Sequence, residues 1–193
     1  MRTRKTVIIT GDRGGGKTHF ITNLFEFLSL FENQICGFVS KGIFDEDGRK
    51  EFVLKDLSSG QEFPLASRTP KEGYENTGRF WFNPAAVTHG ESIMKKAVEE
   101  KCKVLIIDEM GPVELAGGAW HNGFVNVFAN YQGILVFSTR ETMLEKLIEK
   151  YGIHEAFIEN IGTTTPRKTG DSIISMLNLH QPAPGHDLEQ QTE

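Results

Sequence analysis

The chain has 193 residues, with 21 Lys and Arg against 26 Asp and Glu, so its formal net charge is −5. No apolar run approaches the roughly 20 residues of a membrane span, and the apolar run at residues 7–9 is too short for a signal-peptide core. The acidic balance argues against broad nucleic-acid binding. We therefore expect a cytoplasmic globular protein without membrane contact, whose oligomeric state the sequence leaves open.

The first segments of the chain alternate between strand and helix patterns. Residues 6–10 form a short β-branched run that predicts a buried strand. Glycine-rich residues follow, and apolar side chains at helical spacing then predict a helix over residues 17–32 that packs one face on a sheet. Residues 34–40 predict a second strand.

Residues 38–82 have the pattern of antiparallel hairpins inserted early in the chain. Turn sequences at residues 45–49 and 58–60 separate alternating segments, and residues 67–77 are expected to form a loop. The strands predicted here are residues 51–56, a segment that ends at Leu65, and residues 79–82.

The rest of the chain returns to alternating strands and helices, which indicates an α/β fold with a mostly parallel sheet flanked by helices. Asn83 and Pro84 are typical of a helix start. We expect a single domain over residues 1–179 and a disordered acidic tail over residues 180–193. The predicted strands are residues 104–107, 134–137 and 157–161, and the predicted helices are residues 92–101, 120–131, 142–151 and 171–177.

Two cysteines, Cys36 and Cys102, lie far apart in apolar surroundings. We expect both to be reduced thiols in the core, because cysteine is among the residues most often buried. Neither belongs to a CxxC pair, and the six histidines show no pair at metal-ligand spacing, so no zinc-type site is expected.

Residues 11–18 match the phosphate-loop pattern GxxxxGK[ST], with a strand before them and a helix after them. Glycines let backbone N–H groups converge on a phosphate, and the helix N-terminus adds unpaired donors. Lys17 is expected to bind the β- and γ-phosphates and to act in catalysis, and Thr18 to offer its hydroxyl to Mg²⁺. The predicted nucleotide-binding residues are Gly11, Asp12, Arg13, Gly14, Gly15, Gly16, Lys17, Thr18 and His19.

A second pair of candidate residues, Asp108 and Glu109, ends the apolar run at residues 104–107. In open α/β sheets, ligands bind at the carboxyl ends of the strands. Asp108 therefore fits the metal-side acid for Mg²⁺, and Glu109 is placed to orient or deprotonate an attacking water.

The run IIDEMGPVEL, together with GDRGGGKT, resembles the signature of the small nucleoside-triphosphatase family of thermophiles, known in animals as the cancer-related nucleoside-triphosphatase. The similarity spans residues 5–140. It implies a RecA-like P-loop core and slow, Mg²⁺-dependent hydrolysis of ATP, GTP and other nucleoside triphosphates with loose base selectivity. By position it assigns phosphate and metal to Lys17 and Thr18, the metal-side acid to Asp108 and the general base to Glu109. Glu114 lies in the matching motif without an assigned role.

Other residues have two readings each. Arg140, after the strand at residues 134–137, could contact the γ-phosphate in catalysis or simply begin a helix. Residues 163–168 could line a base pocket or form a plain polar loop. The aromatic residues 80–82 could stack on a base or belong to a half-buried edge strand. No NKxD sequence is present, which argues against a guanine-specific GTPase.

Three functions fit these features. The first is a Mg²⁺-dependent nucleoside triphosphatase, the second a nucleotide or small-molecule kinase, and the third a nucleotide-dependent switch or binding module. The acidic charge excludes none of them, because the tail from His180 carries three acids and no Lys or Arg, which leaves −2 on the rest of the chain.

Overall fold

The computed structural model describes residues 5–46 and 48–178, and no helix in this part of the chain is long and apolar enough to cross a membrane. The predicted tail at residues 180–193 lies outside the described residues. The strands are β1 (Lys5–Gly11), β2 (Ile35–Asp45), β3 (Gly48–Asp56), β4 (Glu62–Ser67), β5 (Glu75–Thr77), β6 (Phe80–Phe82), β7 (Val104–Met110), β8 (Ile134–Arg140) and β9 (Phe157–Asn160). The helices are α1 (Lys17–Leu28), α2 (Pro84–Glu99), α3 (Pro112–Leu115), α4 (His121–Asn130), α5 (Glu141–Tyr151) and α6 (Pro166–Asn178).

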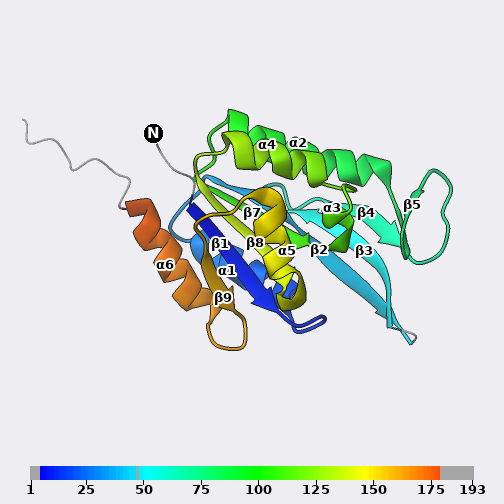
Figure 1. The fold of residues 1–193 in the computed structure, drawn as a ribbon, viewed down its shortest axis with the longest axis horizontal. Helices are drawn as coiled ribbons and strands as arrows, with labels where there is room; N and C mark the ends of the chain where they lie inside the picture. The colour runs from blue at the N-terminus through cyan, green and yellow to red at the C-terminus, as the bar shows by residue number, and fades with distance from the viewer. Residues whose placement is uncertain (1–4, 47, 179–193) are drawn as a thin grey trace, which may run out of the picture.

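The strands form a mixed sheet in the order β5-β6-β4-β3-β2-β7-β8-β1-β9 (Figure 1). From β2 to β9 the pairings are parallel, and from β2 to β5 they are antiparallel. The expected α/β fold is confirmed, but the expectation of a mostly parallel sheet is wrong. The sheet is mixed because the hairpins of residues 38–82 continue the main sheet through β2. Strand β2 pairs with β7 on one side and with β3 on the other.

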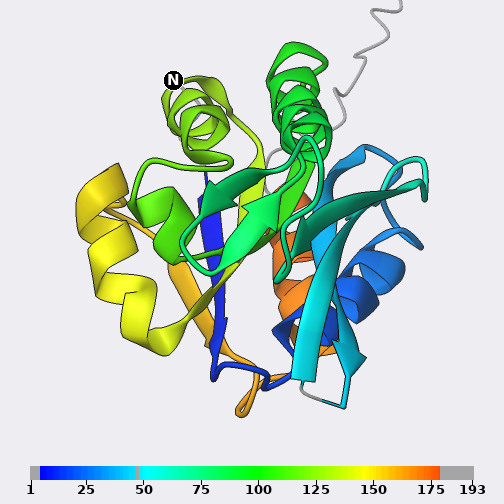
Figure 2. The ribbon, with the colours of Figure 1, turned by 90° about the vertical axis from the view of Figure 1, so that its right-hand side faces the viewer.

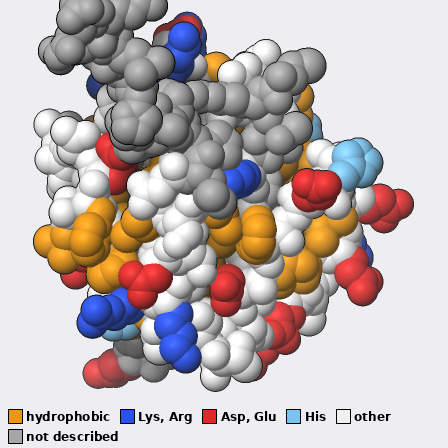
Figure 3. All heavy atoms as spheres, turned by 90° about the vertical axis from the view of Figure 1, so that its left-hand side faces the viewer, with side chains coloured by type: hydrophobic (Ala, Val, Ile, Leu, Met, Phe, Trp, Pro, Cys, Tyr) orange, Lys and Arg blue, Asp and Glu red, His pale blue; other side chains and the backbone are white. Residues whose placement is uncertain are grey.

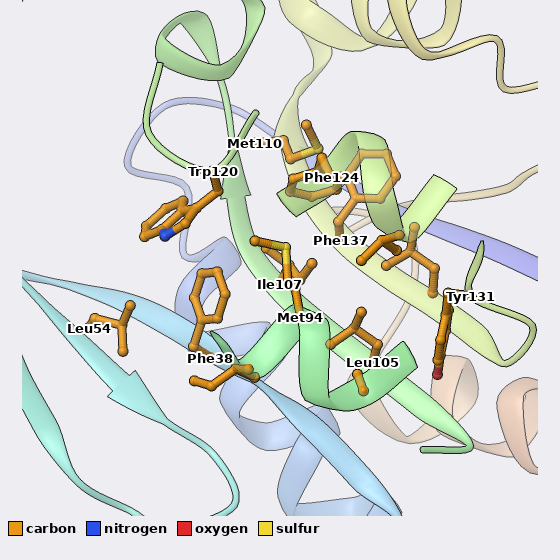
Figure 4. Packing of buried hydrophobic residues seen from close by; sticks show 14 of the residues in the cluster. Phe38, Leu54, Met94, Leu105, Ile107, Met110, Trp120, Phe124, Tyr131 and Phe137 are labelled. Atoms are coloured by element: carbon orange, nitrogen blue, oxygen red, sulfur yellow. The ribbon is translucent and has the colours of Figure 1, made fainter. Parts of the chain in front are cut away.

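Helices cover both faces of this sheet, and the strand residues alternate between them. Leu105 and Ile107 of β7 pack with α2 and α4, whereas Val104 and Ile106 pack with α1 and α6. Figure 2 shows the α2–α4 layer and α1 on opposite sides of the strands. The rings of Phe38 and Trp120 lie 4.7 Å apart in the first of these layers (Figure 4). The central parallel strands β1, β7 and β8 are thus buried on both faces.

Several element boundaries differ from those predicted. Helix α1 ends at Leu28, and Phe31, expected on its apolar stripe, is 62% exposed. Helix α2 runs without a break from Pro84, where the Asn83 side chain accepts a hydrogen bond from the Ala85 N–H. The last helix, α6, begins at Pro166, five residues before the predicted start at Asp171.

The two cysteines are joined in a disulfide, so the prediction of reduced core thiols is wrong. Cys36 lies on β2, and Cys102 comes just before β7, the parallel neighbour of β2. Their Cα atoms are 6.2 Å apart, within the range of disulfides. The sequence could not indicate this pairing, because the two cysteines are 66 residues apart and only the pairing of β2 with β7 brings them together.

Strands β2 and β7 approach each other closely at Gly37. Its φ of +146° is one that residues with a side chain rarely adopt, and an added Cβ would overlap the carbonyl oxygen of Ile106. The close approach brings the next part of β2, including Ser40, to the carboxyl end of β7. This is the end that carries the predicted carboxylates.

Candidate functional site

The predicted phosphate loop joins the end of β1 to the start of α1, as the motif requires. Gly14 and Gly16 have φ values of +77° and +96°, and no atom lies within 4 Å of a Cβ built on either. Gly16 is also the N-cap of α1 and has no side chain to cap the helix, so the first N–H groups of the helix receive no side-chain cap from it. The loop is therefore an open backbone surface suited to an anion.

Lys17 is 4% exposed and points its amine back into this loop. Its Nζ donates hydrogen bonds to the carbonyl oxygens of Gly11 at 3.2 Å and Asp12 at 2.9 Å. A buried ammonium held only by neutral carbonyl groups is a strong site for an incoming anion. The geometry thus gives the phosphate loop one fixed positive charge.

Asp108, at the carboxyl end of β7, is fully buried and meets the phosphate loop. Its carboxyl group accepts hydrogen bonds from the Ser138 hydroxyl and from the backbone N–H of Ser40, the latter at 3.4 Å, and the Thr18 side chain lies close enough to lower the pKa of Asp108. Burial raises the pKa of Asp108 to about 6, and these hydrogen bonds oppose the rise. Two predicted metal ligands, Thr18 and Asp108, therefore lie side by side although 90 residues separate them in the chain.

The chemistry of this pair fits Mg²⁺. A hydroxyl and a carboxylate are hard oxygen ligands, and Mg²⁺ in nucleotide sites uses one or two protein ligands plus water and phosphate oxygens. Among the described residues, no group of three or more His, Cys, Asp or Glu could hold a metal by itself. A metal at Thr18 and Asp108 would therefore complete its shell with water and phosphate oxygens.

Glu109 follows Asp108 and is paired with Arg140 at the end of β8. The Nε of Arg140 lies 3.2 Å from Oε1 of Glu109, and both side chains are partly exposed. The peptide bond between Asp108 and Glu109 is cis. The structure thus brings together Lys17, Thr18, Asp108, Glu109 and Arg140 at one edge of the parallel strands.

Other predicted nucleotide-binding residues lie at the rim of this site. Asp12, Arg13 and Gly15 are exposed, and His19 lies on an exposed part of α1, where its ring nitrogen is 3.1 Å from the Asn23 amide. The segment after β9 is close to the loop, because the Ile161 side chain lies where a Cβ on Gly11 would be. Residues 163–168 therefore continue from a segment that borders the phosphate loop.

The aromatic residues of β6 lie in the antiparallel half of the sheet. There the rings of Phe80 and Phe52 pack edge to face at 5.1 Å. Phe80 and Phe82 also line a pocket that Glu109 borders. Residues 80–82 are half-buried in a strand, as one reading expected, but β6 is not an edge strand, because it pairs with β4 on one side and β5 on the other.

Three polar residues of the site were not predicted. Ser40 donates its hydroxyl to the Asp108 carbonyl at 2.7 Å, and Ser138 donates to the Asp108 carboxyl group. Both follow apolar runs within strands adjacent to β7, which is the signal that could have identified them. Glu114 was left without a role, and it is 4% exposed.

Glu114 fixes the segment that follows Glu109. Its Oε2 accepts a hydrogen bond from the Gly111 N–H at 2.8 Å, and its backbone carbonyl accepts from the Lys150 amine and the Tyr151 hydroxyl. Burial raises the pKa of Glu114 to about 7, and the negative charge of Glu109 adds to the rise. Burial and the charge of Glu114 raise the pKa of Tyr151 to about 12.

The raised pKa of Glu114 predicts a pH-dependent stability. Between about pH 4.5 and pH 7 the folded chain retains a proton that the unfolded chain releases, so the free energy of unfolding falls as pH rises through this window. We expect Glu114→Gln to reduce the loss of unfolding free energy between these pH values by on the order of 1 to 3 kcal/mol. Denaturant titrations at a series of pH values measure it.

The control for this measurement is Glu149→Gln, on an exposed position of α5. The pKa of Asp108 is also raised, and it contributes the same pH dependence of stability in every variant. Only the difference between the wild-type and Glu114→Gln stability curves therefore reports Glu114. Parallel curves for Glu114→Gln and the wild type would contradict the buried, proton-retaining carboxyl group.

A cavity of about 500 Å³ lies elsewhere. It opens where β1 begins, and its lining includes Phe31, Tyr131 and Ile174 but none of the predicted site residues. Figure 3 views the molecule from the left-hand side of Figure 1, where apolar patches lie between acidic and basic side chains. Cavity size therefore does not locate the phosphate loop, which lies at the opposite ends of the strands.

Comparisons with known proteins agree with this arrangement. A family model described as NTPase matches residues 6–164. The nucleoside-triphosphatase THEP1 of Sulfurisphaera tokodaii is 32% identical over 118 residues, which cover 60% of this chain and 66% of that protein. The THEP1 of Archaeoglobus fulgidus is 29% identical over 154 residues, which cover 77% of this chain and 87% of that protein. The match to the Ignicoccus hospitalis protein spans 59% of the length of that relative.

Two solved structures have a similar fold. The solution structure of a human cancer-related nucleoside triphosphatase has a TM-score of 0.67 at 18% identity, and covers 92% of this chain and 100% of its own. The crystal structure of THEP1 from the hyperthermophile Aquifex aeolicus has a TM-score of 0.64 at 20% identity, with coverages of 92% and 99%. At these identities the likeness concerns the fold.

Proposed function

Because this chain belongs to the NTPase family, whose model matches residues 6–164, we propose that it hydrolyses the γ-phosphate of nucleoside triphosphates. ATP, GTP and other nucleoside triphosphates are the proposed substrates, and Mg²⁺ is the proposed cofactor. The observation that carries the proposal is that Asp108 of β7 lies beside the phosphate loop, close enough for the Thr18 side chain to lower the pKa of Asp108. This contact joins the phosphate loop to the carboxylate pair of β7.

The strand order supports a P-loop fold of the RecA-like class. In the parallel half of the sheet, β8 lies between β1, which carries the phosphate loop, and β7, which carries Asp108. This order places the loop and the carboxylates on strands that lie on either side of β8. Ligands of open α/β sheets bind at such carboxyl ends.

Each residue then has a role in the reaction. Lys17 and the N–H groups of the loop bind the β- and γ-phosphates, and Thr18 with Asp108 would hold Mg²⁺. The chemistry that bound Mg²⁺ supplies is neutralisation of charge on the phosphate oxygens. Glu109 orients a water in line with the γ-phosphorus and accepts its proton, while Arg140 holds the Glu109 carboxylate and offers a positive charge to the γ-phosphate.

The loose base selectivity follows from what surrounds the loop. The Ile161 side chain borders Gly11 of the loop, and an apolar side chain distinguishes bases poorly. The NKxD sequence that reads guanine is missing from the chain. ATP and GTP are therefore expected to be used at comparable rates.

Release of inorganic phosphate from ATP and GTP tests the proposal. Purified protein is expected to release phosphate without any added acceptor, and removal of Mg²⁺ with EDTA is expected to slow release by at least about 100-fold. Re-addition of Mg²⁺ serves as the control. Tight nucleotide binding without phosphate release would instead identify a nucleotide-dependent switch.

A further inference from the structure

A second pocket opens on the other side of the Glu109–Arg140 pair from the phosphate loop. It has a volume of about 120 Å³, and residues 11–18 do not line it. Its walls come from β3, β4 and β6 on one side and from α3 and the start of α4 on the other. The apolar lining residues are Phe52, Leu65, Phe80, Phe82, Val113 and Trp120.

The position of the pocket relates it to the reacting phosphate. Strand β8 separates the phosphate loop from β7, and the pocket lies beyond β7 towards the antiparallel half of the sheet. Glu109 borders both the pocket and the proposed nucleotide site. A molecule in the pocket would therefore lie on the same side of the γ-phosphate as the attacking water.

The lining predicts the chemistry of the occupant. Charged groups at the rim are already paired, because Glu109 binds Arg140 and Glu114 accepts the Gly111 N–H. An ionic occupant would thus lose its hydration without gaining an unpaired charge, and the unpartnered Nε1–H of Trp120 is a neutral donor. An engineered apolar cavity of roughly 150 Å³ holds benzene, so a volume of about 120 Å³ suits an apolar body of about that size.

We propose that this pocket binds an uncharged alcohol with a ring-sized apolar body, and that its hydroxyl accepts the γ-phosphoryl group in place of water. The inference rests on the proposed nucleotide site. The alcohol oxygen forms a bond to the γ-phosphorus, and the bond from that phosphorus to the β–γ bridging oxygen breaks. The hydroxyl proton passes to Glu109, and the products are a phosphate monoester and the nucleoside diphosphate.

Benzyl alcohol with Mg-ATP tests the inference. ³¹P NMR is expected to detect benzyl phosphate, so that free phosphate falls below the amount of ADP formed. Without the alcohol, water reaches the same phosphorus, and phosphate and ADP appear in equal amounts. Protein-observed NMR titration with benzyl alcohol measures occupation of the pocket independently.

A variant that fills the pocket separates this inference from the proposed hydrolysis. Val113→Phe adds a ring at a half-buried pocket position, and Val125→Phe makes the same change at a position of α4 that is 49% exposed. We expect Val113→Phe to reduce transfer to benzyl alcohol by roughly 10-fold or more and to leave hydrolysis within about 2-fold, and Val125→Phe to change neither.

A second variant keeps the test informative if Val113→Phe is unstable. Phe80→Ala enlarges the pocket and is expected to shift preference from benzyl alcohol to the larger 2-naphthylmethanol. If the wild-type protein, with benzyl alcohol present, still released phosphate and ADP in equal amounts, the inference would be overturned. Binding of benzyl alcohol without transfer would overturn it as well. Transfer that is unaffected by Val113→Phe would overturn the assigned pocket. If no ADP forms at all, the proposed triphosphatase itself fails.

Discussion

Glu109→Gln is expected to lower kcat for phosphate release by about 10² to 10⁴, the usual contribution of a general base. The substitution removes the basic carboxylate but leaves an oxygen that can accept the hydrogen bond from Arg140 Nε, now 3.2 Å from Oε1. The binding groups of the phosphate loop remain in place. The affinity for a fluorescent nucleotide is therefore expected to stay close to that of the wild type.

Steady-state phosphate release and nucleotide titration, measured on the same preparations, check this prediction. Glu145→Gln, at an exposed position of α5, is the matched control and should behave as wild type. Unchanged release by Glu109→Gln would exclude Glu109 as the base. An equal loss of binding and turnover would indicate a structural role instead.

Lys17→Ala is expected to reduce kcat/KM by about 10² to 10³. Its ammonium is the fixed charge of the loop, buried and bonded to two backbone carbonyl groups. In contrast to Glu109→Gln, this change should also weaken nucleotide binding, because a charge-assisted hydrogen bond contributes about 1.5 to 3 kcal/mol. Glu109→Gln is therefore expected to lower kcat alone, whereas Lys17→Ala is expected to lower nucleotide affinity as well.

Kinetics and nucleotide titration again provide the measurement, and thermal unfolding shows whether the variant is folded. Lys146→Ala, which removes an exposed lysine of α5, is the matched control. A folded Lys17→Ala protein that keeps wild-type kcat/KM would contradict the phosphate-binding role.

Local sequence predicted those parts of the site whose residues are contiguous. The run from Gly11 to Thr18 predicts both the loop and the groups proposed to bind the ligand, because the glycines, the lysine and the helix start are contiguous in the chain. The apolar strand before Asp108 likewise located the carboxylates. These patterns depend on backbone geometry over a few residues and do not require knowledge of the sheet.

The features that depend on strand pairing could not be predicted. Ser40 and Ser138 reach Asp108 only because β2 and β8 lie on either side of β7. The same pairing brings Cys36 to Cys102. The three-residue strand β5 was expected as loop, since its residues are exposed or half-buried and it is an edge strand that pairs with β6. Alternating hydrophobicity is weak in such a short segment.

The order of the strands also has a consequence for how the chain folds during its synthesis. The hairpins β2–β3 and β3–β4 pair neighbours in sequence, so they can form as soon as residues 35–67 are available. Strand β1 is made first, but its partners β8 and β9 begin only at Ile134 and Phe157. A nascent chain therefore carries the phosphate loop long before it has the strands that hold it, and nucleotide binding must be among the last properties it acquires.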